Sequence, residues 1–124
     1  MKIVIIGSIK FYPEYLKIKQ ELEEKGHKVI IPLPNEFYHG EPDIKRKTME
    51  EFNQYILKCD AVIIANFEKD GKKNYIGTNS LMEIGIAFNR KKKIFVLNQI
   101  PDSCRIELEA IGAVELNRDL GKIS

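Results

Sequence analysis

Short runs of apolar residues, almost uninterrupted by polar ones, constrain the fold of this chain most strongly. They occupy residues 2–6 (KIVII), 28–33 (KVIIPL), 61–65 (AVIIA) and 93–97 (KIFVL). Runs of this kind are typical of strands that are buried on both faces of a parallel sheet. A shorter run at residues 113–116 predicts a fifth strand.

Amphipathic segments separate these runs. Apolar side chains recur at helical spacing in residues 13–25 and 44–58, and helices are also predicted around Glu83 and over residues 105–111. Alternating strands and helices predict right-handed βαβ units with helices on both faces of the sheet. We therefore expect an α/β fold, a single-domain flavodoxin-like (Rossmann-type) three-layer sandwich over residues 1–124, with a parallel sheet of four or five strands.

The composition favours a soluble globular protein and excludes several function classes. Of 124 residues 44% are apolar and 31% charged, and the net charge is only +2, so attraction to a nucleic acid polymer should be weak. No apolar stretch approaches the ~20 residues that span a membrane, and the opening run is too short for a signal peptide. We expect a cytoplasmic protein without membrane contact.

Metal and dinucleotide cofactors are not expected either. Cys59 and Cys104 lie far apart, and His27 and His39 are isolated, so the sequence contains no metal-binding pattern. The sequence also lacks the glycine pattern G-x-G-x-x-G and a phosphate-binding P-loop. We therefore predict no cofactor.

One carboxylate in the helix around Glu83 is unusual. Glu83 is the only charged residue between Ser80 and Phe88. We expect the helix to begin with a cap at Asn79 or Ser80, which would put Glu83 near the first turn. There the helix dipole would favour its ionised form by ~0.3–1 kcal/mol, and an ionised carboxylate can act as a nucleophile.

A purely structural role for Glu83 is also open. Ser80 and Glu83 have the spacing of a capping box, in which the glutamate bonds back to the backbone of the cap residue. Gly85 favours the functional interpretation, because glycine inside a helix is destabilising by ~1 kcal/mol relative to alanine. We expect a strand or a ligand to approach the backbone at Gly85.

The carboxyl ends of the strands are where a ligand site is expected in such a sheet. This rule selects the loops at residues 7–12, 66–80 and 98–103, and it places Asp60 at the opposite end of the sheet. Gly7 with Ser8, and Gly77 with Thr78, stand at strand-to-helix junctions that can bind an anion.

The loop at residues 34–43 carries the aromatic side chains Phe37, Tyr38 and His39. These side chains either stack on a nucleobase or cover the core. The sequence favours neither interpretation over the other.

Two motifs resemble a known family. Gly7, Ser8, Ile9 and Lys10 follow the first strand, and a later helix contains Glu83, Ile84, Gly85 and Ala87. This pattern resembles the nucleoside 2-deoxyribosyltransferase superfamily, which includes the 2'-deoxynucleoside 5'-monophosphate N-glycosidases. Asp60, Ala61 and Val62, and the strand that begins at Lys93 and Ile94, fit as well, so the resemblance extends roughly to Leu97.

The resemblance implies a reaction at Glu83. The family's glutamate attacks the anomeric carbon of a nucleoside or nucleotide, the base leaves, and a second base or water resolves the glycosyl-enzyme. Homodimers or larger homo-oligomers, in which a neighbouring subunit completes the site, are implied too. The loop at residues 7–12 would contact base or sugar, and residues 77–80 a sugar hydroxyl or the 5'-phosphate. The substrate-binding residues expected are Gly7, Ser8, Ile9, Lys10, Tyr12, Asn66, Gly77, Thr78, Asn79, Ser80 and Asn98.

The chain departs from the family pattern at its second carboxylate. Phe52 takes the place of the acidic residue that orients the sugar, and Glu50 and Glu51 should point elsewhere, because neighbours on a helix differ by ~100°. The acidic residue often found before the nucleophile's helix is also absent, with Asn74, Gly77 and Asn79 in that region.

Three interpretations of the function follow. The first is a nucleoside or nucleotide N-glycosidase or base-exchange enzyme that uses Glu83. The second is a non-catalytic nucleotide-binding or sensing domain of the same fold. A purely structural flavodoxin-like module is the third, and the fold alone does not separate them.

Overall fold

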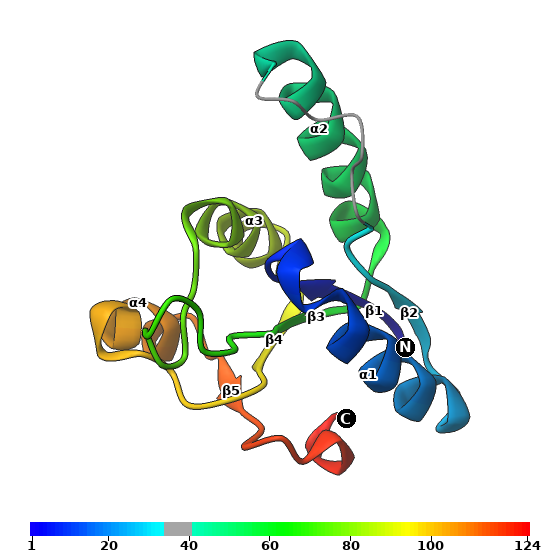
Figure 1. Cartoon of the computed structure of the whole chain (residues 1–124). Coiled ribbons are helices and arrows are strands. Elements are labelled where there is room, and N and C mark those ends of the chain that lie inside the picture. Colours follow the sequence, from blue (N-terminus) through cyan, green and yellow to red (C-terminus); the bar gives the residue numbers. More distant parts are fainter. Residues whose placement is uncertain (34–40) are drawn as a thin grey trace.

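The computed structural model of the chain describes residues 1–33 and 41–124 (Figure 1). The expected roles of Phe37, Tyr38 and His39 concern residues outside this described part. In it, five parallel strands form one sheet in the order β2-β1-β3-β4-β5. This order is that of flavodoxin-like proteins, so the predicted fold class is confirmed. The strands are β1 (Lys2–Ile6), β2 (Lys28–Ile30), β3 (Ala61–Ile64), β4 (Lys93–Val96) and β5 (Val114–Glu115).

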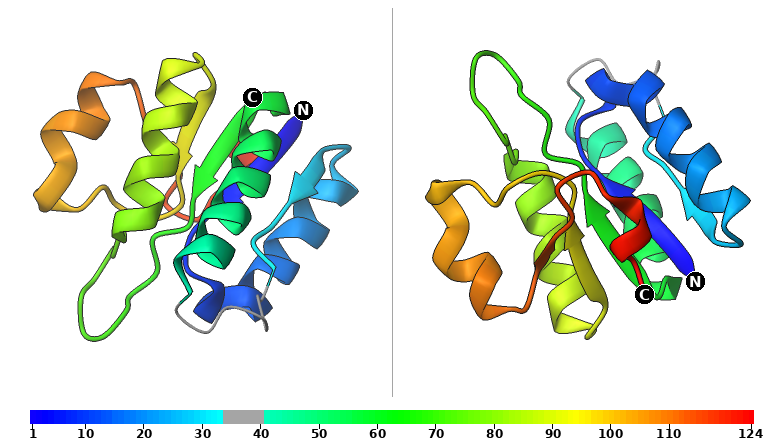
Figure 2. Two further views of the ribbon diagram at one scale, coloured as in Figure 1. Left: turned by 90° about the horizontal axis from the view of Figure 1, so that it is seen from above. Right: turned by 90° about the horizontal axis from the view of Figure 1, so that it is seen from below.

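Helices cover both faces of the sheet (Figures 1 and 2). Side chains of β1 alternate between the two faces: Ile3 and Ile5 pack in the core under α1 (Tyr12–Glu24), with the C-terminal segment against the same face. Val4 and Ile6 pack on the other face, in the core that the remaining helices cover. These are α2 (Pro42–Lys58), α3 (Thr78–Asn89) and α4 (Arg105–Ala110).

The ends of several elements differ from the predicted ones. Helix α2 begins at Pro42, two residues before the predicted start, because proline fits the first turn of a helix. Strand β2 ends at Ile30, before Pro32, which has no N–H to contribute to a ladder. Three 3₁₀ turns were not predicted: η1 (Ile9–Phe11), η2 (Asp102–Cys104) and η3 (Leu120–Lys122).

Asp60 lies at the amino-terminal end of the sheet, as expected. Its Oδ2 accepts a 2.7 Å hydrogen bond from the backbone N–H of Lys2. The carboxylate therefore joins the starts of β1 and β3, on the end of the sheet opposite to the loops expected to bind a ligand.

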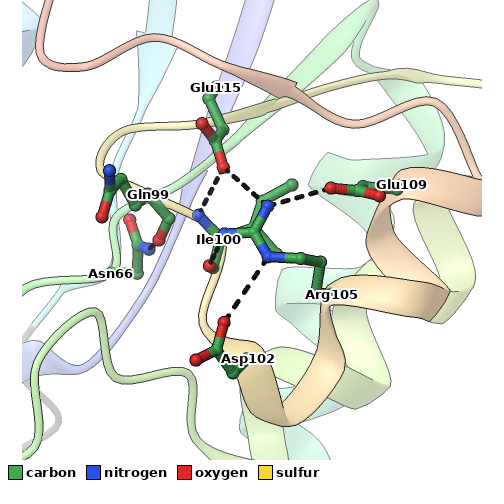
Figure 3. A network of polar contacts seen from close by, with 7 residues as sticks. All are labelled: Asn66, Gln99, Ile100, Asp102, Arg105, Glu109 and Glu115. Atoms are coloured by element: carbon green, nitrogen blue, oxygen red, sulfur yellow. Dashed lines mark hydrogen bonds and ion pairs between the residues drawn. The ribbon is translucent and has the colours of Figure 1, made fainter.

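A polar network fixes the segment after β4 (Figure 3). The Arg105 guanidinium donates to the Ile100 carbonyl at 2.7 Å and pairs with Glu109 at 2.9 Å. Glu115 on β5 accepts from the Ile100 N–H at 2.9 Å. The network holds α4 and the edge strand together.

No helix within residues 1–33 and 41–124 has the length and apolarity to cross a bilayer.

Candidate active site

A cavity of about 860 Å³ opens at the carboxyl ends of β1, β2 and β3. Sheet order reverses between β1 and β3, and ligands of such sheets bind at this point. Nine of the twelve residues expected at the site line this cavity. They are Gly7, Ser8, Ile9, Tyr12, Gly77, Thr78, Asn79, Ser80 and Glu83.

Lys10, Asn66 and Asn98 do not line the cavity. Lys10 is exposed and pairs with Asp70 at 3.7 Å. Asn66 is completely buried: its amide donates to the Gln99 carbonyl at 2.7 Å and accepts from the Asn98 N–H at 2.9 Å. Its position at the end of a strand therefore reflects a structural link between β3 and β4. The loop at residues 98–103 contributes no lining residue.

Helix α3 begins earlier than expected, and this changes the setting of Glu83. Its N-cap is Gly77, which offers no side chain, and Asn79 and Ser80 lie inside the helix. The predicted cap and the capping box are therefore wrong. Glu83 lies in the second turn, and Asn79 Nδ2 donates to Glu83 Oε1 at 3.4 Å, one turn along the helix.

Burial dominates the electrostatic setting of the Glu83 carboxyl. Its side chain is only 7% exposed, and this burial raises its pKa to about 7, an effect that the Lys45 ammonium partly opposes. A rise of this size corresponds to roughly 3 kcal/mol, at ~1.4 kcal/mol per pKa unit, whereas a helix dipole contributes ~0.3–1 kcal/mol. Desolvation therefore outweighs the stabilisation of the ionised form that was expected from the helix dipole.

A hydrogen bond from Tyr15 on α1 fixes the loop after β1. The Tyr15 hydroxyl donates to the Ser8 carbonyl at 2.7 Å, and burial raises the pKa of this phenol, so the proton stays in place. A Cβ at Gly7 would collide with the Tyr15 hydroxyl oxygen and lie 3.2 Å from the Ala65 carbonyl. Gly7 is therefore required by close packing, which explains the Gly-Ser pair at this junction.

Lys69 also lines the cavity, although it was not predicted as a site residue. Its Nζ lies 3.4 Å from Ser8 Oγ, so it links the loop after β3 to the loop after β1. In the sequence it belongs to the polar stretch at residues 69–73 (KDGKK), which resembles an ordinary solvated loop. The only available signal was the position of this loop at the carboxyl end of a strand.

Glu51 also lines the cavity, in contrast to the expectation that it points elsewhere. The cavity is wide enough to contact a broad arc of α2, which includes both Glu51 and Phe52. Glu51 and Phe52 differ by ~100° around the axis of α2, and both directions lie within the part of the helix that faces the cavity. Glu50 behaves as expected, since it lines a separate shallow groove between α2 and α3.

Gly85 lies on that groove, away from Glu83. A Cβ at Gly85 would meet no atom within 4 Å. The expectation that a strand of this chain approaches the helix backbone there is therefore wrong.

Metal ligands are not gathered at this cavity. Within residues 1–33 and 41–124, no cluster of His, Cys, Asp and Glu side chains could hold a metal ion. The reactive groups in the described lining are the two carboxylates, the lysines and the hydroxyls.

No protein-family model matches the chain, and no curated protein sequence matches it. Solved structures do. The chain is similar to a 2-deoxyribosyltransferase from Bacillus psychrosaccharolyticus, with 19% identity and a TM-score of 0.62 over 83% of this chain and 78% of that one. A CMP N-glycosidase from Clostridium botulinum is 21% identical, with a TM-score of 0.57 over 94% of this chain and 90% of that one.

A 2-deoxyribosyltransferase from Leishmania mexicana is 22% identical, with a TM-score of 0.54 over 90% of this chain and 71% of that one. These likenesses establish the fold. The chain shares it with 2-deoxyribosyltransferases and an N-glycosidase, in agreement with the superfamily that its sequence resembles.

Proposed function

We propose that this protein cleaves the N-glycosidic bond of a nucleoside or nucleotide, with Glu83 as the nucleophile. The observation that carries the proposal is the position of one buried carboxylate in the cavity at the β1/β3 reversal point. The same fold is found in 2-deoxyribosyltransferases and in a CMP N-glycosidase, which supports this class of reaction.

The reaction would proceed in two steps. A Glu83 oxygen bonds to the anomeric carbon as the carbon–nitrogen bond breaks, and the electron pair leaves with the base, which takes a proton from solvent. Water, or a second base, then bonds to the anomeric carbon and loses a proton to solvent, while the bond from that carbon to the Glu83 oxygen breaks and Glu83 is released as a carboxylate. Water gives hydrolysis and a second base gives transfer.

The electrostatic setting suits a nucleophile that works near neutral pH. With a pKa of about 7, a substantial fraction of Glu83 is ionised at neutral pH. A weakly solvated carboxylate with a raised pKa is also more basic than an exposed one. Asn79, by donating to Glu83 Oε1, would hold the carboxylate in one orientation.

Glu51 is our candidate for the second carboxylate, which orients the sugar in the family that the sequence resembles. Glu51 lines the same cavity as Glu83. In the sequence it is adjacent to Phe52, which occupies the position where the second carboxylate was expected. A carboxylate at this rim could accept hydrogen bonds from sugar hydroxyls.

A non-catalytic nucleotide-binding domain is the second candidate function. The 7% exposure of Glu83 and the bulk of Phe52 in the lining favour it, because both restrict approach to the carboxylate. In this alternative, Glu83 would bind a sugar hydroxyl without attacking carbon.

Base release from the full chain distinguishes the two candidates. The wild type, Glu83→Gln and the control Glu50→Gln are incubated with ribo- and deoxyribonucleosides and their 5'-monophosphates, and free base is measured by chromatography. We expect release by the wild type and the control, and at least a ~1,000-fold loss in Glu83→Gln. Absence of release from every substrate, with ligands still raising the melting temperature, would favour the binding domain.

The expected assembly and location are proposals as well. We propose a homodimer or larger homo-oligomer of one-domain subunits, as the family resemblance implies, and a location in the cytoplasm, as the composition suggests. Leu81, Met82 and Phe88 on α3 are between 46% and 54% exposed, and apolar side chains of this size are common in subunit contacts. Light scattering after size-exclusion chromatography gives the number of subunits.

A further inference from the structure

We propose that the cavity is specific for a nucleoside 5'-monophosphate and that Lys69 and Ser8 bind its phosphate. This inference rests on the proposed function and narrows its substrate class. It is carried by a cation and a hydroxyl whose hydrogen-bonding capacity is incompletely used within residues 1–33 and 41–124.

Lys69 faces the cavity with donors to spare. Its Nζ lies 3.4 Å from Ser8 Oγ and 5.5 Å from the centre of the Tyr75 ring. An ammonium carries three N–H donors, and Ser8 accepts from only one of them. In the described part of the chain, Lys69 forms no ion pair with a carboxylate. An anionic ligand would provide the missing counter-charge.

Ser8 is oriented so that its hydroxyl hydrogen is available. Its Oγ accepts from the Lys10 N–H at 3.3 Å and from Lys69 at 3.4 Å, which uses both lone pairs. The Ser8 carbonyl is occupied by the Tyr15 hydroxyl at 2.7 Å. The O–H of Ser8 is therefore left to donate, and it lies beside the ammonium that would share the same acceptor.

Two other lysines line the cavity but have different surroundings. Lys19 Nζ pairs with Glu23 at 2.9 Å and donates to the Val29 carbonyl at 2.6 Å, so its charge is already balanced. The Lys45 ammonium acts on Glu83, whose pKa it lowers. Lys69 is thus the lining lysine best placed for an anion of the substrate.

A phosphomonoester matches this pair of residues. It carries ~1.5 to 2 negative charges at neutral pH and three acceptor oxygens, which can take bonds from an ammonium and a hydroxyl together. A nucleoside has only a neutral 5'-hydroxyl at that position and leaves the Lys69 charge uncompensated. We therefore expect monophosphates to bind at least ~10-fold more tightly than nucleosides.

Equilibrium binding tests this without depending on catalysis. Calorimetry on the full chain with Glu83→Gln compares nucleosides, their 5'-monophosphates, ribose 5-phosphate and inorganic phosphate. Adding Lys69→Met should weaken monophosphate binding by ~10- to 100-fold and leave nucleoside binding unchanged, and Lys69→Arg should retain most of the affinity. Ser8→Ala gives an independent, smaller loss for monophosphates alone.

Lys72→Met is the matched control. Lys72 is in the same loop, and its ammonium also lies over the Tyr75 ring, at 5.9 Å, but it does not line the cavity. This variant should bind every ligand as its parent does. The melting temperature of each variant shows that it is folded.

Several results would overturn the inference. They are equal affinities for nucleosides and monophosphates, an equal loss for both in Lys69→Met, or inorganic phosphate or ribose 5-phosphate binding as tightly as the nucleotide. The proposed function fails separately, by absence of base release from any substrate. An enzyme that releases base from nucleosides without preferring monophosphates would retain the proposed function and lose this inference.

Discussion

Asn79 Nδ2 donates to Glu83 Oε1 at 3.4 Å, and within the described residues no other side-chain hydrogen bond reaches this carboxylate. Both residues lie on the cavity side of α3, one turn apart. A hydrogen bond donated to a carboxylate favours its ionised form. Burial raises the pKa of Glu83 to about 7, and the Lys45 ammonium partly opposes this rise. We expect the Asn79 donor to act in the same direction as Lys45.

Asn79→Ala should raise the pKa of Glu83 further, by up to ~1 unit, because the donor is lost. Asn79→Asp should raise it more, since a second carboxylate would stand one helical turn away. NMR titration of the Glu83 side-chain carbon measures both shifts directly. Asn89→Ala, at the exposed far end of α3, is the control. An unchanged titration in Asn79→Asp would show that the two side chains do not interact in solution.

The buried Glu83 makes stability depend on pH. Its pKa is about 7 in the folded protein and 4.5 in the reference state, so it is protonated in both states below pH 4.5. As pH rises from 4.5 to about 7, the unfolded chain ionises first, and the free energy of unfolding falls by about 3 kcal/mol.

Glu83→Gln should remove this dependence. Relative to the wild type, the variant should gain about 3 kcal/mol in stability between pH 4.5 and pH 7, and the difference should stay constant outside this window. Urea unfolding at a series of pH values measures it. A stability difference that does not change with pH would contradict the raised pKa.

Gly7 and Tyr15 form a packed pair that a double-mutant cycle can test. Gly7→Ala should destabilise the protein by ~1–3 kcal/mol, because the new Cβ collides with the Tyr15 hydroxyl oxygen. In the Tyr15→Phe background that oxygen is absent, so the same substitution should be much less destabilising. Thermal unfolding of the four proteins gives the coupling energy. Equal effects of Gly7→Ala in both backgrounds would locate the strain elsewhere, for instance at the Ala65 carbonyl.

Asn66 is a structural residue, and its substitutions should act on stability. Asn66→Ala removes the bonds to Gln99 and Asn98 and leaves their partly buried backbone groups without these partners, which should cost ~1–3 kcal/mol. Asn66→Asp should be at least as destabilising, because it replaces a buried donor with a carboxylate. Urea unfolding measures the loss. If Asn66→Ala instead weakened ligand binding at full stability, the assignment as a structural link would be wrong.

The sequence predicted the sheet well because its signal is local. Runs such as residues 3–6 and 61–65 are apolar throughout and completely or almost completely buried, as is typical of strands covered on both faces of a parallel sheet. Because ligands bind at the carboxyl ends of the strands, the loops at residues 7–12 and 66–80 were predicted to form one site, and residues of both loops line one cavity.

The properties of the site depended on tertiary burial, which the sequence did not reveal. The pKa of Glu83 follows from the surroundings that desolvate it. Lys69 looks like a solvated lysine until the fold places it beside Ser8, and Glu51 becomes a lining residue only because the cavity spans a broad arc of α2. Asn66 has the sequence position of a ligand-binding residue, but the fold uses both ends of its amide.

Gly85→Ala should stabilise the protein by ~0.5–1 kcal/mol, because alanine is favoured over glycine inside a helix and the added Cβ meets no atom within 4 Å. Gly26→Ala is the contrasting variant: Gly26 also has open space but has a φ of +93°, so alanine there should be destabilising. Urea unfolding compares both with the wild type. The contradicting result is a loss of stability in Gly85→Ala that grows with protein concentration. It would mean that a second copy of the chain packs against α3 at Gly85. The stabilisation expected from helix propensity would then be absent.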